Sequence, residues 1–162
     1  MKILVSVGRL DVGGVELRTL ETIRHLRSIG REYVIYIYVT SGRKGVLDER
    51  YKSVGAHIIY GYPGWRTVVK YYKTIKRIRP QVVHINASYA SGIFSCIAYF
   101  CGTPRRIAHI RSMSFPEMYL VYKLKYLLYI PLLNIFSTHV VGVNSYARRT
   151  ARTKLAKWTT LY

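Results

Sequence analysis

The sequence predicts an α/β fold of the Rossmann-like type, a doubly wound parallel sheet of about six strands with helices on both faces. Short β-branched runs alternate along the chain with longer amphipathic segments, which is typical of parallel sheets. Runs such as Ile3-Leu4-Val5 and Val82-Val83 lack any polar residue, as strands buried on both faces do. Polar residues follow several of these runs, which predicts a ligand crevice at the carboxyl ends of the strands.

The first half of the chain is expected to contain three strands and two helices. The first helix is predicted because Leu17, Leu20 and Ile23 recur on one face ahead of Gly30. The second helix ends before Pro80, which disfavours helical backbone in the residue ahead of it. The predicted strands are Lys2–Gly8, Tyr33–Thr40 and His57–Tyr60, and the predicted helices are Val15–Ile29 and Trp65–Arg79.

The second half continues the alternation with three more strands and three helices. The predicted strands are Val82–Asn86, Arg106–Arg111 and His139–Asn144, and the predicted helices are about Tyr89–Phe100, Glu117–Phe136 and Arg148–Lys157. We therefore expect one domain over residues 1–147, followed by a basic tail or helix at residues 148–162.

The composition indicates a folded domain that favours anionic partners. The chain has 162 residues and a net charge of +19, from 26 Lys and Arg against 7 Asp and Glu. Half of the residues are hydrophobic, which is too apolar for a disordered basic tail. The charge favours nucleic acid, an anionic membrane surface or a phosphorylated ligand, and by itself it does not choose among them.

The cysteines and the apolar segments bear on the compartment. Cys96 and Cys101 are five residues apart and would not share a helix face, so we expect reduced core residues and no disulfide or metal site. The N-terminal apolar run meets Arg9 at once and is too short for a signal peptide. The longest apolar region, Tyr119–Phe136, carries two lysines and Pro131, so no transmembrane segment is expected. These features predict a cytoplasmic protein.

Three predicted strands finish on a polar residue at the expected crevice. These residues are Asn86, Arg111 and Asn144, with Ser88, Ser112 and Ser145 close behind them. Because Asn and Ser often cap helices, capping alone is an alternative interpretation for these positions. His109 precedes Arg111 by two residues, so on a strand both side chains point to the same face.

The turn after the first strand contains the pair Gly13-Gly14, followed by Glu16. Its spacing matches neither a dinucleotide fingerprint nor a Walker A loop. The two glycines would still let the backbone approach a ligand closely, and the following helix would offer unpaired amides to a phosphate. Glu16 suits the helix dipole but would discourage a bare anion. The alternative is a flexible turn without a ligand, in which Glu16 caps the helix.

Four segments together resemble the N-terminal domain of family 4 glycosyltransferases, which have the two-domain GT-B architecture. The first is the opening strand with Val12-Gly13-Gly14-Val15-Glu16. The segment Arg77–Asn86 is similar to the family's basic-Pro-Asp-Val-Val-His strand, and Gly102–Ser112 is similar to its Gly-x-Pro-Arg-Arg-Ile-Ala-His-x-His-Ser segment. Residues 140–145 resemble the strand before the linker to the second domain. The four occur in the family's order and cover about residues 1–147.

The resemblance implies transfer of a sugar from a nucleotide-diphosphate sugar to a glycan or lipid-linked acceptor, in surface polysaccharide or glycolipid synthesis. Hexosyl transfer with retention and without an essential metal is implied. The resemblance assigns Gly13 and Gly14 to the donor diphosphate and gives Glu16 the role of ordering the turn. It places the acceptor or the cleft near Arg9, Glu16, Asn86, Ser88, Ser112, Asn144 and Ser145.

This sequence departs from the family's pattern at several positions. Gln81 replaces the usual Asp, and Asn86 and Arg111 stand where many members have His. The second His of the family's His-x-His segment is often tied to catalysis; Arg111 replaces it and could bind a phosphate or carboxylate bidentately. We expect His109 and Arg111 to be catalytic, with a hydrogen-bonded core histidine as the alternative for His109. His84 is expected to be structural.

The family's second domain, which carries the donor nucleotide pocket, is absent from this sequence. The chain is therefore expected to be a fragment, a truncated product or half of a split enzyme, inactive without a separate donor domain. The alternative function is a non-catalytic nucleotide- or polyanion-binding domain of Rossmann-like type.

Basic and tyrosine-rich helix faces favour an anionic inner membrane surface as a partner. One helix carries a basic stripe of Arg66, Lys70, Lys73 and Arg77, opposite Trp65, Val68, Tyr72 and Ile75. A later helix carries Tyr119, Tyr122, Tyr126 and Tyr129. A solvated charged face with a tyrosine packing seam is the alternative.

The sequence contains no recognised nucleic-acid module, so no specific nucleic acid is expected. Further cations expected near the crevice are Arg9, Arg105, Arg106 and Arg111.

Overall fold

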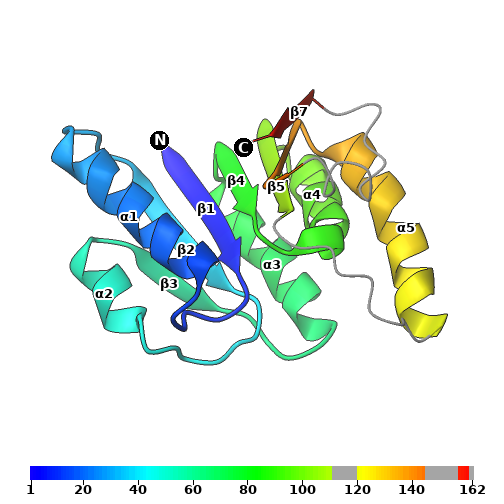
Figure 1. Cartoon of the computed structure of the whole chain (residues 1–162), viewed down its shortest axis with the longest axis horizontal. Helices are drawn as coiled ribbons and strands as arrows, with labels where there is room; N and C mark the ends of the chain where they lie inside the picture. The colour runs from blue at the N-terminus through cyan, green and yellow to red at the C-terminus, as the bar shows by residue number, and fades with distance from the viewer. Residues whose placement is uncertain (111–119, 145–156, 161–162) are drawn as a thin grey trace. The chain divides into compact units, whose positions relative to one another are not determined.

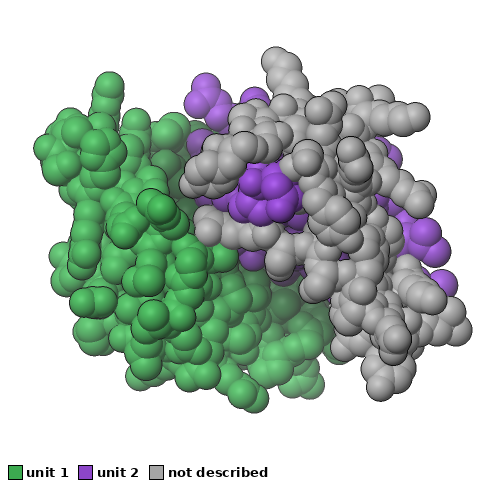
Figure 2. Space-filling view, viewed as in Figure 1, with its two compact units in different colours: residues 1–81 green, residues 82–162 purple. Residues whose placement is uncertain are grey.

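The computed structural model describes residues 1–110, 120–144 and 157–160 (Figure 1). The chain divides into two compact units, Met1–Gln81 and Val82–Tyr162 (Figure 2). Neighbouring strands within each unit are parallel. Parallel neighbours require a crossover connection, and in both units helices supply such crossovers.

Unit 1 has three strands in the order β3-β2-β1. β1 pairs with β2 along its whole length, and β3 pairs with the last four residues of β2. The elements are β1 (Lys2–Val7), α1 (Gly14–Ser28), β2 (Val34–Val39), α2 (Asp48–Ser53), β3 (His57–Tyr60) and α3 (Arg66–Ile78).

The main hydrophobic core of unit 1 lies on one face of its sheet. Alternate residues of β1 and β2 face this side, because strand side chains alternate between the two faces. They pack against α1 and α2 in a cluster that includes Val5, Val7, Leu20, Ile23, Ile35, Ile37, Val39 and Tyr51. The Tyr51 hydroxyl donates a hydrogen bond to the carbonyl of Glu16 at 2.6 Å, which fastens α2 to the first turn of α1.

The opposite face of the same sheet is covered by α3. Tyr38 of β2 is fully buried, and its ring meets that of Tyr71 edge-on at 5.1 Å. The Tyr38 hydroxyl donates to the carbonyl of Thr67 at 2.7 Å. Unit 1 therefore has helices on both faces, as a doubly wound fold requires.

The described part of unit 2 has four strands in the order β4-β5-β6-β7. The elements are β4 (Val82–Ile85), η1 (Ser88–Ala90), α4 (Ser91–Phe100), β5 (Arg105–Ile110), α5 (Leu120–Phe136), β6 (His139–Gly142) and β7 (Lys157–Thr160). Helices α4 and α5 lie side by side (Figure 1). A side chain added at Gly92 of α4 would place its Cβ 2.0 Å from the carbonyl oxygen of Tyr129, so the two helices cross here in backbone contact.

The predicted fold class is confirmed, and most predicted elements occur within one or two residues of their expected bounds. The predicted helix at residues 89–100 begins as the 3-10 turn η1. Two elements were not predicted, α2 and β7, and Lys157 begins the strand β7 where a helix was expected. The rest of that expected helix, together with the first residues of the one expected at 117–136, lies outside the described residues.

The two cysteines are reduced, as expected, but they are less buried than expected. Cys96 and Cys101 are free thiols, and both are half-buried rather than fully buried. Burial raises the pKa of the Cys96 thiol, because it disfavours the charged thiolate. Within the described part of the chain, no helix is long and apolar enough to cross a membrane.

Candidate functional site

The glycine turn of unit 1 joins the carboxyl end of β1 to α1. Gly13 is the N-cap of α1, and its carbonyl accepts a hydrogen bond from the amide of Leu17 at 2.9 Å. A side chain at Gly13 would place its Cβ 2.5 Å from Oε2 of Glu16, so the carboxylate of Glu16 lies directly over Gly13. Gly14 is exposed, with nothing within 4 Å of an added Cβ. The open side of the turn is thus at Gly14.

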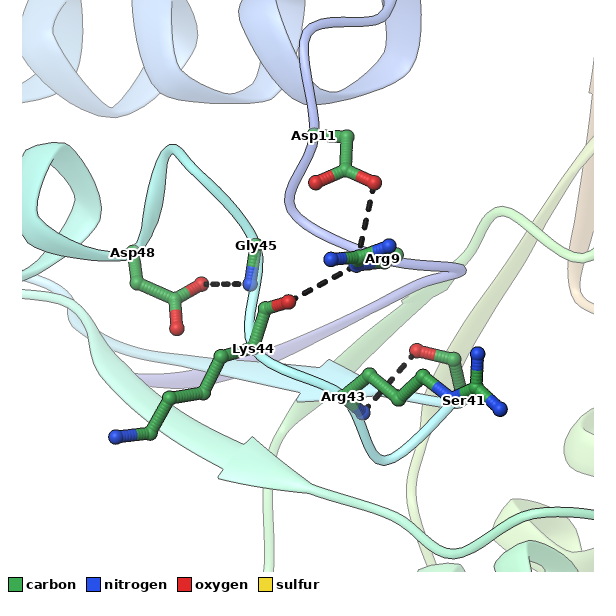
Figure 3. A network of polar contacts seen from close by, with 7 residues as sticks. All are labelled: Arg9, Asp11, Ser41, Arg43, Lys44, Gly45 and Asp48. Carbon is green, nitrogen blue, oxygen red and sulfur yellow. Dashed lines mark hydrogen bonds and ion pairs between the residues drawn. The ribbon is translucent and has the colours of Figure 1, made fainter.

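The turn is held by contacts with the segment that follows β2. Arg9 forms an ion pair with Asp11, with 3.2 Å from Nε to Oδ2, and the same nitrogen donates to the carbonyl of Lys44 at 2.9 Å (Figure 3). The amide of Leu47 donates to the carbonyl of Leu10 at 2.8 Å. Arg9, expected in the cleft, is therefore engaged in holding its own turn. These contacts favour an ordered turn over the flexible turn that was the alternative interpretation.

A buried carboxylate organises the loop on which the turn rests. Asp48 is 5% exposed and accepts a hydrogen bond from the amide of Gly45 at 3.1 Å (Figure 3). Its other oxygen accepts a hydrogen bond from the hydroxyl of Tyr60, at the end of β3. Burial, this hydrogen bond and the nearby carboxylate charge raise the pKa of Tyr60 to about 12. The role of Asp48 was not predicted from the sequence, because its contact with Tyr60 depends on how α2 packs beside β3.

The candidate catalytic residue His109 lies near the carboxyl end of β5 in unit 2. It is 5% exposed, and its Nδ1 lies 3.2 Å from Nε2 of His84 on β4. The two rings stack with centroids 5.4 Å apart. His109 is therefore a buried and hydrogen-bonded histidine that also lies at the strand end where ligands bind in this fold class. The pairing with His84 was not predicted from the sequence.

The other polar residues of unit 2 also follow strand ends. Asn86 comes directly after β4 and is half-buried, and Asn144 follows β6 and is exposed. Ser88 begins η1 with a φ of 48°, a left-handed backbone conformation that is uncommon outside glycine. The expected site residues Arg111, Ser112 and Ser145 lie outside the described residues.

Two cations expected near the crevice lie elsewhere. Arg105 and Arg106 begin β5, so they are at its amino end, whereas ligands bind beyond the carboxyl end. The Arg106 guanidinium donates to the carbonyls of Phe136 and Thr103, both at 2.6 Å, and to that of Pro104 at 3.1 Å. Burial lowers the pKa of Arg106, because it disfavours the charged form. The expectation was therefore wrong, and Arg106 is a structural clamp.

The basic stripe of α3 lines a surface groove of about 400 Å³ in unit 1. Arg66, Lys70, Lys73 and Arg77 all contribute to it, together with Tyr62 and Trp65. Trp65 is 74% exposed and lies in the same groove as the cations. It was expected on the opposite face of the helix, and this expectation was wrong because adjacent positions on a helix differ by only about 100°.

Among the described residues, no group of three or more His, Cys, Asp or Glu side chains could hold a metal ion. The chemical groups that the structure does bring together are the glycine turn with Glu16 in unit 1, and the His84–His109 pair in unit 2.

No family model matches the chain. A curated relative, the capsular polysaccharide biosynthesis glycosyltransferase CapH from Staphylococcus aureus, is 30% identical over 152 residues. The match covers 92% of this chain and 42% of CapH, so the chain spans less than half the length of this relative.

The fold is shared with solved structures of low sequence identity. Anabaena HepE, in a crystal structure with UDP-glucose, matches with a TM-score of 0.70 at 15% identity, covering 99% of this chain and 43% of HepE. The lipopolysaccharide outer core galactosyltransferase WaaB, in its apo form, matches with a TM-score of 0.63 at 12% identity, covering 100% of this chain and 45% of WaaB. The chain has a Rossmann-like fold of the GT-B type.

Proposed function

We propose that this chain is the acceptor-side domain of a glycosyltransferase of family 4, which transfers a sugar from a nucleotide-diphosphate sugar to a glycan or lipid-linked acceptor. The reaction would serve surface polysaccharide or glycolipid synthesis. The observation that carries the proposal is the 30% identity to CapH over 152 residues. The fold shared with the UDP-glucose complex of HepE supports a nucleotide sugar as the donor.

In this proposal the glycine turn receives the donor diphosphate. The exposed Gly14 opens the first turn of α1, whose free amides and positive dipole end attract a phosphate. The Glu16 carboxylate lies over Gly13, where it would oppose a bound anion. It would either move aside when the phosphate binds, or stay in place and hold the turn while the phosphate binds at Gly14. A further domain, in the same chain or another, would supply the nucleotide pocket and the rest of the charge stabilisation.

His109 and Arg111 are the proposed catalytic residues, in a hexosyl transfer that retains stereochemistry and needs no metal. The buried position of His109 at the end of β5 supports this role, because its pairing with His84 fixes the ring orientation. Asn86, Ser88 and Asn144, at the ends of strands of the same unit, would contact the acceptor. Arg9 would act by holding the glycine turn.

We further propose that the enzyme works peripherally at the inner face of the cytoplasmic membrane. The described part of α5 exposes an apolar row, with Leu124, Leu127, Leu128 and Ile135 each about 60% exposed. Such a row on a chain with a net charge of +19 suits the boundary of an anionic bilayer. Leu127→Asn combined with Leu128→Asn should abolish flotation with anionic vesicles if the proposal is right.

The experiment that tests the enzymatic function is a chimera in which this chain replaces the matching segment of CapH. Transfer of labelled sugar from a nucleotide sugar to a membrane acceptor is the measurement. We expect activity in the chimera, its loss in His109→Gln, and its retention in the control His57→Gln, which alters an exposed histidine. A folded but inactive chimera that still binds polyanions would favour the non-catalytic alternative.

A further inference from the structure

The groove along α3 contains cations that form no ion pair with any acidic residue that the structure describes. The ion pairs of the described residues are Arg9–Asp11, Arg18–Glu21 and Lys52–Glu49, and none of them involves α3. The sequence has no Asp or Glu at all from residue 50 to residue 116. Like charges spaced three or four residues apart on a helix repel one another and destabilise it slightly. A ligand of opposite charge would remove this repulsion.

The cations form a straight row rather than a compact cluster. The row is Arg66, Lys70, Lys73 and Arg77, and its first and last members are eleven positions apart on α3, which is about 16 Å along the helix axis. Their groove has a volume of about 400 Å³, which is within the range of pockets that take small ligands. A row of this length inside a groove fits a linear chain that carries repeated negative charges.

The wall of the groove is aromatic at its first end. Trp65 is 74% exposed and Tyr62 is 50% exposed. The ammonium of Lys70 lies 4.3 Å from the centre of the Tyr62 ring, so a cation–π contact holds this lysine along the groove. Flat, exposed aromatic rings beside cations can stack on the apolar face of a sugar ring while the cations pair with its acidic group.

The groove begins beside the carboxyl end of strand β3. Tyr62 follows β3 by two residues, so the aromatic end of the groove is at the carboxyl end of a parallel strand, where ligands of this fold class bind. The row of cations then leads away from that edge along α3. A chain whose end reaches the strand edges can therefore lie in the groove.

We propose that the α3 groove binds an acidic glycan, a linear sugar chain carrying carboxylate or phosphate groups, as the acceptor or growing product of this domain. The inference rests on the proposed function, since it names the class of acceptor. A flat membrane fits the observations less well, because the four cations line one groove instead of a flat face, and Lys70 is half-buried there against the Tyr62 ring. Stacking of nucleic-acid bases is the other alternative.

Binding of a short oligogalacturonate, which has one carboxylate per sugar, tests the proposal on the chain itself. The double variant Lys70→Gln/Lys73→Gln should weaken binding on the order of tenfold at low salt, and Trp65→Ala should weaken it as well. The control Arg24→Gln/Arg31→Gln removes the same charge from exposed positions at and beyond α1 and should change the affinity less than about twofold. A neutral maltooligosaccharide should not bind.

The proposal is overturned if the control pair weakens binding as much as the groove pair, because the charge would then act non-specifically. It is also overturned if single-stranded RNA or anionic vesicles bind through Lys70 and Lys73 while oligogalacturonate does not. The binding assay uses this chain without a donor domain, whereas the CapH chimera measures sugar transfer. A failure of glycan binding can therefore be distinguished from a failure of the proposed enzymatic function. An active chimera with no groove-dependent glycan binding refutes the acidic acceptor alone.

Discussion

His84 and His109 are hydrogen-bonded across two neighbouring strands, with 3.2 Å between Nε2 of the first and Nδ1 of the second. The register explains the contact, because His84 is paired with Ile107, two residues before His109 and on the same face. One of the two nitrogens must donate and the other accept, so only one proton lies between them. The tautomer of each ring is therefore tied to that of its neighbour.

We expect substitution of His84 to change the tautomer of His109. His84→Leu removes the partner of Nδ1, whereas His84→Gln retains an amide that can reach the same position. Ring ¹⁵N chemical shifts of His109 at neutral pH should move in the leucine variant and stay near the parent values in the glutamine variant. Unchanged shifts in both variants would show that the pairing does not fix the tautomer.

Arg106 is expected to stabilise unit 2, whereas its neighbour Arg105 is not. Arg106→Gln removes a charged donor from the carbonyls of Thr103, Pro104 and Phe136, which should lower the free energy of unfolding by about 2 kcal/mol. Arg105→Gln makes the same change in charge at an exposed position and should alter it by less than about 0.5 kcal/mol. Urea denaturation measures both, and equal losses would contradict the clamp.

Gly92→Ala should force α4 and α5 apart. The added methyl group would lie 2.0 Å from the carbonyl of Tyr129, and a backbone atom does not swing away as a side chain does. We expect a loss of about 1–3 kcal/mol, despite the better helix propensity of alanine. Gly8→Ala is the control, since its methyl group would meet nothing within 4 Å. A melting temperature of Gly92→Ala equal to that of the control would refute the close crossing.

Tyr60 should make the stability of the chain fall at alkaline pH. Its pKa is raised from 10.0 to about 12, so below pH 10 the folded and unfolded states are both protonated. Above pH 10 the unfolded state loses this proton first, and stability is lost until the folded tyrosine ionises near pH 12. Tyr60→Phe should flatten this part of the curve of unfolding free energy against pH. The exposed Tyr72→Phe should leave it unchanged, and an equal effect of both would contradict the assignment.

The elements that the sequence predicted well have strong local signals. β3 has its expected bounds, and α3 ends at Ile78 because Pro80 follows. The two missed elements lack such signals. α2 has six residues with a single buried aromatic, too few to show a helical period, and β7 has only four residues in a basic tail.

The candidate site was predictable only where it depends on position along a strand. The rule that ligands bind beyond strand ends drew attention to Asn86 and Asn144 from the sequence alone, whereas His109 was singled out by the family resemblance and by its shared strand face with Arg111. The contact with His84 depends on the register of β4 against β5, which no local pattern reveals. Arg105 and Arg106 were wrongly expected near the crevice, although the sequence pattern was sufficient to exclude them. Both residues begin the strand, so they lie at its amino end and not at the carboxyl end where ligands bind.

The two ends of β5 hold different kinds of residue. Arg106 anchors the amino end to backbone carbonyls, and His109 stands three residues later, about 10 Å along the strand. Substitutions at Arg106 should therefore change the melting temperature, whereas substitutions at His109 should change ligand binding, if the proposed site is right. For protein engineering, this makes β5 a strand whose chemistry can be redesigned at His109 while Arg106 preserves the scaffold.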